Sequence, residues 1–203
     1  ARGAARRIEC ANGMRQIGLA ALNYESASRS FPAGSTSTNS GILGRYWTTW
    51  AIDLLPMLEE QATYDLWQKE FSLQARENQP IREAIVQAYL CPSDAPSLAR
   101  VETLVRPDSG PGSSQAHAPG SYRAVSGHSL GVTGDHFWDN PLAQNGSVRN
   151  TNAMPEEWRG AMCVTLKEPK ARDRKIRPAK MKDIKDGTSK TLLVGEYHTT
   201  TVP

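Results

Sequence analysis

The first 30 residues carry the pattern that most constrains how this chain folds. Between residues 4 and 27, apolar side chains recur at spacings of four and three, which is typical of one face of an α-helix. The residues on this seam are Cys10, Met14, Ile17, Ala21 and Tyr24. No capping residue precedes the helix, and a helix that starts without a cap often continues upstream. Such a seam also needs a body on which to pack.

The helices after this first one are expected to be short. Residues 32–45 read as a Gly/Ser/Thr loop, and 46–55 fits either a strand or a short buried helix that runs into a helical segment at 56–60. Helix-forming residues continue through 61–72. Pro80 suits the first position of another helix, which we expect to reach about Tyr89.

Strands are expected mainly in the second half of the chain, after a Pro/Gly/Ser-rich stretch that begins at residue 92. The segments concerned are 101–105, 122–125, 161–166 and 191–197. Asp186-Gly187 is a strong turn signal just before the last of them. A helix first, then short helices, then strands is an order typical of the α+β class.

Composition limits the classes of partner. The chain has 203 residues and a net charge of +3, which is too small to argue for nucleic acid. No stretch approaches the roughly 18 apolar residues that span a bilayer. Charge is unevenly spread: residues 1–30 hold five Arg against two Glu, 53–83 hold seven acids against three bases, and 165–186 hold nine bases against four acids. These segments are either opposite patches that dock or ordinary solvated faces.

The three cysteines are Cys10, Cys91 and Cys163, and their spacing matches no zinc-binding pattern. A disulfide between Cys10 and Cys91 would staple the first helix to the body. It would close a loop of about 80 residues and contribute roughly 2–4 kcal/mol. The alternative is two buried thiols that act as small apolar side chains. The sequence leaves both open.

Catalytic patterns are weak. Residues 127–131 match Gly-x-Ser-x-Gly with Ser129 at the centre, but the residues that follow are a poor helix start, so a Gly-rich loop is favoured over a serine hydrolase. Two groups of side chains have the chemistry for metal ions. They are His128, Asp135, His136 and Asp139, and the turn residues Asp183, Asp186, Thr188 and Ser189. Neither group has a recognised metal-site spacing, so we predict no catalytic residue, no metal and no cofactor.

Aromatic residues in the loops at 107–160 offer another role. Trp138 and Trp158 lie in a stretch rich in Gly, Ser and Pro. Exposed aromatic faces suit sugar rings, so these residues are candidate contacts in a ligand- or glycan-binding module of the cell envelope. The competing interpretation is that they pack in the core.

Five blocks of the sequence, in order, resemble one bacterial family. Its members carry a prepilin-type N-terminal cleavage/methylation segment followed by a domain of unknown function. The blocks are residues 6–20 (RRIECANGMRQIGLA), 30–34 (SFPAG), 54–59 (LLPMLE), 90–94 (LCPSD) and 183–196 (DIKDGTSKTLLVGE).

The resemblance implies an architecture and a role. A basic leader is cut by a prepilin peptidase, and a hydrophobic helix then anchors the protein in the inner membrane. Residues 1–28 would be the soluble half of that helix, and 29–203 an extracytoplasmic α+β head. The expected fold is pilin-like, with the long helix packed on an antiparallel sheet and with long inserted loops and short extra helices. The implied function is a non-enzymatic, pseudopilin-like subunit whose partners are other pilin-like subunits or secretion components.

Overall fold

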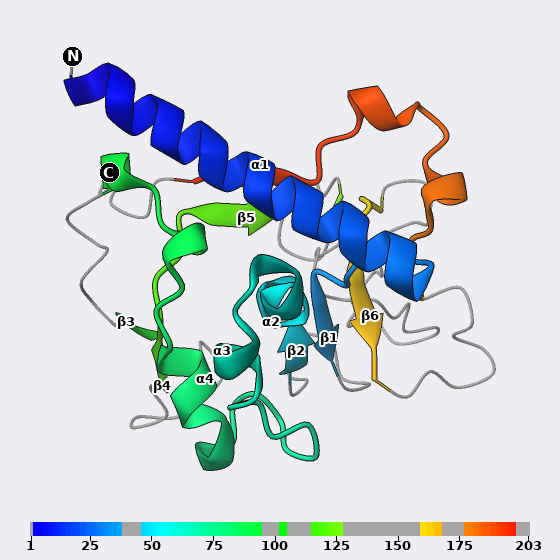
Figure 1. The fold of residues 1–203 in the computed structure, drawn as a ribbon. Coiled ribbons are helices and arrows are strands. Elements are labelled where there is room, and N and C mark those ends of the chain that lie inside the picture. Colours follow the sequence, from blue (N-terminus) through cyan, green and yellow to red (C-terminus); the bar gives the residue numbers. More distant parts are fainter. Residues whose placement is uncertain are drawn as a thin grey trace, which may run out of the picture.

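The computed structural model describes residues 2–37, 46–94, 102–104, 115–127, 159–167 and 177–197. One long helix, α1 (Arg2–Ser28), lies across a body of short helices, 3₁₀ turns and short strands (Figure 1). The predicted α+β class, with a long N-terminal helix and short extra helices, is confirmed.

α1 follows the predicted periodicity. Its buried side chains are Cys10, Ile17, Ala20 and Ala21, and Met14 and Tyr24 pack against the same core. At the end of the helix, Arg29 adopts a left-handed φ of 60°, and its N–H donates to the carbonyl of Glu25 at 2.7 Å. A left-handed residue just after the last helical turn is a common helix stop.

The segment after the first loop contains both of the elements that the sequence allowed. β2 (Tyr46–Thr49) passes directly into α2 (Trp50–Asp53), and Leu55–Leu58 forms a 3₁₀ turn. Glu59 then takes a left-handed φ of 64° and ends this helical stretch.

The helix expected from the helix formers at 61–72 is much shorter than predicted. α3 covers only Gln61–Tyr64. The buried side chain of Asn78 explains the difference. Its Nδ2 donates to three backbone carbonyls of the segment 68–72 at 3.0, 3.2 and 3.0 Å, and its Oδ1 accepts the N–H of Gln68 at 2.8 Å. These bonds satisfy backbone groups that a longer helix would pair within itself.

The next helix also stops early. α4 (Gln79–Glu83) ends where Ala84 becomes extended, with φ −67° and ψ 121°, and a 3₁₀ turn follows at Gln87–Tyr89. Val86 is buried while Ile85 is 49% exposed. The chain therefore abandons helical spacing to bring Val86 into the core, so the prediction of a helix to Tyr89 is wrong.

Three small sheets complete the described part of the body. β1 (Ser35–Ser37) lies between β2 and β6 (Val164–Leu166), antiparallel to β2 and parallel to β6, so this sheet is mixed. β3 (Glu102–Leu104) pairs antiparallel with β4 (Gln115–His117).

The third sheet pairs β5 (Tyr122–Ala124) antiparallel with β7 (Val194–Glu196). Each of the four strands expected in the second half is present, as β3, β5, β6 and β7. β1 and β4 lie in segments that were expected to be loops. β1 reads Ser-Thr-Ser, and it is a strand because two neighbours pair with it.

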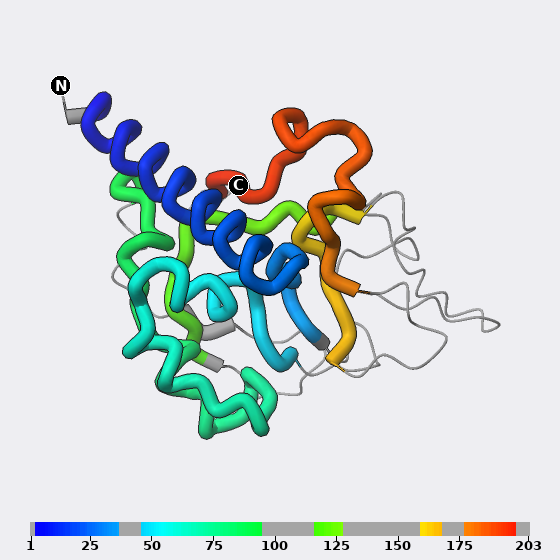
Figure 2. The backbone as a smooth tube through the Cα atoms, turned by 45° about the vertical axis from the view of Figure 1, so that its right-hand side comes forward, coloured from blue at the N-terminus to red at the C-terminus, as the bar shows by residue number. Residues whose placement is uncertain are grey.

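α1 packs against several elements at once. It contacts β7 and the 3₁₀ turns at Leu55–Leu58, Gln87–Tyr89 and Pro92–Asp94. Its buried residues belong to the same core cluster as Ile52, Leu55, Ile81 and Tyr122. Figure 2 shows the N-terminal turns of α1 projecting past the body while its second half crosses over it. α1 and the rest of the chain thus share one core. The division into a helix at residues 1–28 and a head at 29–203 stays a prediction.

Candidate functional site: the first helix and its junction with the body

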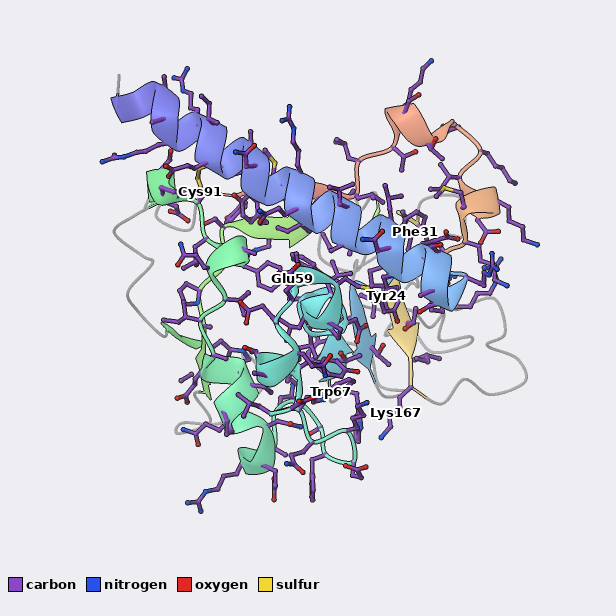
Figure 3. The ribbon with its side chains drawn as sticks, in the orientation of Figure 1. Tyr24, Phe31, Glu59, Trp67, Cys91 and Lys167 are labelled. Atoms are coloured by element: carbon purple, nitrogen blue, oxygen red, sulfur yellow. A yellow bond between two sulfur atoms is a disulfide. The ribbon has the colours of Figure 1, made fainter. Side chains whose placement is uncertain are left out.

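The strongest link between α1 and the body is covalent. Cys10 and Cys91 form a disulfide with a Cα–Cα distance of 4.8 Å and a sequence separation of 81. Both cysteines are buried, at 3% and 0% exposure. In Figure 3, Cys91 lies beneath the N-terminal half of α1, whereas Tyr24 belongs to the C-terminal half. The helix is thus held at two separate places, by the disulfide and by packing around Tyr24.

A network of polar groups surrounds the disulfide. The Ser121 hydroxyl accepts the backbone N–H of Cys91 at 3.1 Å and donates to the Asp94 carboxylate at 3.0 Å. Ser121 and Asp94 are 0% and 2% exposed. The Glu196 carboxylate lies 2.9 Å from Cys91 Sγ. Because this sulfur is part of the disulfide, it carries no thiol hydrogen to donate.

Three of the five recognised blocks meet at this junction. Residues 6–20 supply Cys10, residues 90–94 supply Cys91 and Asp94, and residues 183–196 supply Glu196. Segments far apart in the sequence therefore meet around one disulfide. This junction fixes α1, and within it the Ser121 hydroxyl is hydrogen-bonded to both Asp94 and the backbone of Cys91.

Tyr122 completes the junction and was not singled out from the sequence. Its side chain is 2% exposed, and its hydroxyl donates to the carbonyl of Cys10 at 2.9 Å. Gly13 leaves room for the ring, because a Cβ there would lie 2.6 Å from Tyr122 Oη. A glycine in the middle of a helix that is otherwise well formed is the sequence signal for such a close approach.

The side of α1 that faces away from the body is also apolar. Ile8 and Leu19 are each 62% exposed, and Leu22 is 44% exposed. With about 100° between successive residues, these three fall within roughly 60° of one another and opposite the buried seam. The only charged side chain on the line between them is Arg15. α1 therefore has two apolar faces, and its own body covers one of them.

No helix among the described residues combines the length and the apolar character that crossing a membrane requires. In the same part of the chain, the one cluster of side chains with metal-binding chemistry is Cys10, Cys91 and Glu196. Both sulfurs are committed to the disulfide, so only the Glu196 carboxylate of this set remains as a ligand.

The turn residues considered for calcium are arranged as a turn. Arg177 donates to both carboxylate oxygens of Asp183 at 2.6 and 3.1 Å, and the backbone N–H of Lys180 donates to one of them at 2.9 Å. These hydrogen bonds, Arg177 first, lower the pKa of Asp183 to about 2. Gly187 has a φ of 90°, as the turn signal predicted. Asp186, Thr188 and Ser189 are exposed.

Other predicted site residues lie outside the described residues. They are the aromatic pair Trp138 and Trp158, the serine of the Gly-x-Ser-x-Gly pattern, and the His/Asp group, namely Ser129, His128, Asp135, His136 and Asp139.

The comparison with known families agrees with the recognised blocks. A family model described as "Protein of unknown function (DUF1559)" matches residues 1–202. The chain belongs to this family. No curated protein and no solved structure matches it. Membership of a family of unknown function assigns no activity, so the function is argued below from α1 and its junction.

Proposed function

We propose that the chain is a non-enzymatic, pseudopilin-like structural subunit of a cell-envelope secretion or pilus-type assembly. In its full-length form, a hydrophobic segment upstream of α1 would anchor it in the inner membrane, with the head on the extracytoplasmic side. Its partners would be other pilin-like subunits or secretion components. The observation that carries this proposal is the second apolar face of α1.

A helix with two opposite apolar faces suits packing between two bodies. One face of α1 is buried in its own core, and the other presents Ile8, Leu19 and Leu22 to solvent. Residues 3–9 are exposed on all sides. Leaving large apolar side chains in water costs free energy that a contact with another helix would recover.

The disulfide supports an extracytoplasmic location. Disulfides form and persist mainly in oxidising compartments and are rare in the cytosol of most organisms. Here the bond joins the helix to the body. If the helix is anchored in a membrane, force on it would reach the body through this bond. A covalent link suits a subunit that is held in an assembly by its first helix.

Charge on the surface supports contacts between copies. Arg6, Arg7 and Arg15 are exposed on α1, whereas the body exposes carboxylates in and beside its short helices. The exposed acidic residues between positions 59 and 77 are Glu59, Asp65, Glu70 and Glu77. A basic helix and a cluster of acidic residues at 59–77 on one chain suit head-to-tail contacts between successive subunits.

The experiment is mass spectrometry of the native N-terminus, on protein isolated from membranes. We expect an N-methylated hydrophobic residue about 25–30 residues upstream of Ala1, which leaves room for a span of roughly 20 residues. A native N-terminus at or near Ala1, recovered from a soluble fraction, would overturn the proposal.

The alternative function is an envelope ligand- or glycan-binding module that uses the loops at 107–160. One observation favours it: residues 117–120, 122–124 and 126 of that stretch line a cavity in the body. Trp138→Ala and Trp158→Ala test the aromatic contacts, and a ligand screen that shows no change in either variant would argue against them.

A further inference from the structure

A large cavity lies among the short helices and strands of the body, and Tyr122 forms part of its lining. Its volume is about 940 Å³, within the range typical of small-molecule sites. α2, α4, β1, β5 and β6 each contribute to its walls. Most of the lining is apolar and includes Ile52, Ile81, Val86, Met162 and Val164. These walls belong to buried parts of the chain, yet the described side chains leave the space between them unfilled.

An aromatic pair forms part of the wall. Trp50 and Tyr89 meet edge to face, with ring centroids 5.3 Å apart and an interplanar angle of 71°. The Tyr89 hydroxyl donates to the carbonyl of Ala51 at 2.7 Å, which fixes the ring. A rigid aromatic wall of this kind favours an apolar body as occupant and offers few of the polar groups that a sugar needs.

The charged residues that line the cavity are all basic. Arg82 and Arg123 line it together with His117, and no Asp or Glu is found among the described lining residues. Burial, and then the positive charge of Arg82, lower the pKa of His117, which disfavours its protonated form. The nearest acidic neighbour of Arg82 on its own helix is Glu83, whose carboxylate accepts the Gln79 side chain at 2.9 Å. The cavity therefore has a net positive lining.

Arg82 is the unusual member of this group, because it is only 9% exposed. Its Nη1 donates to the carbonyls of Leu73 and Ala75 at 2.6 and 2.5 Å, which hold the guanidinium in place. Its Nε–H has no acceptor, and neither has the hydroxyl of Ser35, which is 6% exposed and also lines the cavity. Both atoms have less than 1 Å² of accessible surface, so a ligand in the cavity would meet the rest of the Arg82 guanidinium rather than these two atoms.

We propose that this cavity binds an organic acid with an apolar body, whose carboxylate accepts hydrogen bonds from Arg82 and whose apolar part lies against Trp50 and Tyr89. The planar guanidinium matches a carboxylate, and a charge-assisted hydrogen bond is stronger in a site from which water is excluded. This site is separate from the outward face of α1, and the proposal does not depend on the assembly role.

The probes are dodecanoate and 1-dodecanol, which share the apolar chain and differ in the head group. Isothermal titration at pH 7.5, with dodecanoate below its micellar concentration and 1-dodecanol below its solubility limit, measures both. We expect saturable binding of one dodecanoate per chain, and 1-dodecanol weaker by at least about tenfold, the factor expected for one charge-assisted hydrogen bond. Equal affinity for the two probes would show that the carboxylate is not recognised, and no binding of dodecanoate would overturn the proposal.

Two variants place the binding in this cavity. Arg82→Lys keeps a positive charge but loses the planar donor pair, and we expect dodecanoate affinity to fall by about tenfold while 1-dodecanol is unaffected. Because Arg82 also supports two carbonyls, Ala118→Phe serves as a second test, since it fills the cavity from a lining position. It should abolish binding of both probes while the circular dichroism spectrum is kept. The matched control is Ala27→Phe, at an exposed position of α1, which should bind as the wild type does. Unchanged binding in Ala118→Phe would exclude this cavity as the site.

Discussion

At the scale of single residues, the most informative titratable group is Asp53, at the end of α2. Burial raises its pKa to about 6, although Thr48 donates a hydrogen bond to its carboxylate at 2.8 Å. The folded protein therefore holds this proton more tightly than the unfolded chain does. Stability falls as the pH rises from about 4 to about 6, and the full cost of the ionised carboxylate is present above that range.

Asp53→Asn should remove this pH dependence, because the amide is isosteric and can still accept from Thr48. We expect the variant to be more stable than the wild type by about 2 kcal/mol at pH 7.5, and equally stable below about pH 4. Chemical denaturation followed by Trp fluorescence, at four pH values from 4 to 7.5, measures the difference. A difference that is constant across this range would contradict the assignment.

The cysteines give a second prediction at this scale. The native protein should expose no reactive thiol, because Cys163 is buried and burial raises the pKa of its thiol. Ellman's reagent should count one thiol per chain in denaturant and three after reduction.

Cys91→Ser should lower the free energy of unfolding by roughly 2–4 kcal/mol, since the unfolded chain regains the freedom that the cross-link removed. More than one thiol in denaturant without reductant would contradict the disulfide.

Residues that act over long sequence distances were the hardest to predict. The sequence offered Cys10 and Cys91 as a pair, but it left their bonding open. The roles of Asn78 and Tyr122 were not predicted, because each depends on where a distant segment folds back. Asn78 replaces helical hydrogen bonds that local propensity favoured, and the Tyr122 hydroxyl reaches a helix 112 residues earlier in the chain.

At the scale of elements, prediction succeeded where a pattern was long. The seam of α1 spans many turns, so its helix and its buried face could be predicted before any contact was known. α4 and β1 have only five and three residues, and neighbours decide their form. Arg82 and Ser35, which line the cavity, come from these two elements, so sequence reasoning had no route to the cavity.

Two glycines on α1 provide a matched test of this packing. A Cβ at Gly18 would meet nothing within 4 Å, so Gly18→Ala should stabilise the protein by about 0.5–1 kcal/mol through helix propensity. Gly13→Ala brings the same gain in propensity, but its methyl group collides with the fixed Tyr122 ring. We expect Gly13→Ala to lose about 1–3 kcal/mol. Thermal denaturation of both variants checks the pair, and equal shifts would show that Tyr122 does not pack closely on the helix.

At the scale of the whole molecule, α1 is a helix between two environments. Its seam, the disulfide and Tyr122 hold it rigidly on the body, while its other face meets solvent. The stability of the chain depends on the first face only. Assembly, in the proposed role, depends on the second, so substitutions can separate the two.

Leu19→Glu is the substitution that separates them. Leu19 is 62% exposed, so a charge there should change the stability of the isolated chain by less than about 0.5 kcal/mol. In the full-length protein in native membranes, the same charge would be buried at a contact between subunits, and cross-linked higher-order species should fall by at least about tenfold. The control is Gln16→Glu, which adds the same charge at an exposed position beside the apolar face. Cross-linking that is unchanged in Leu19→Glu, or lost equally in Gln16→Glu, would show that this face of α1 is not where subunits meet.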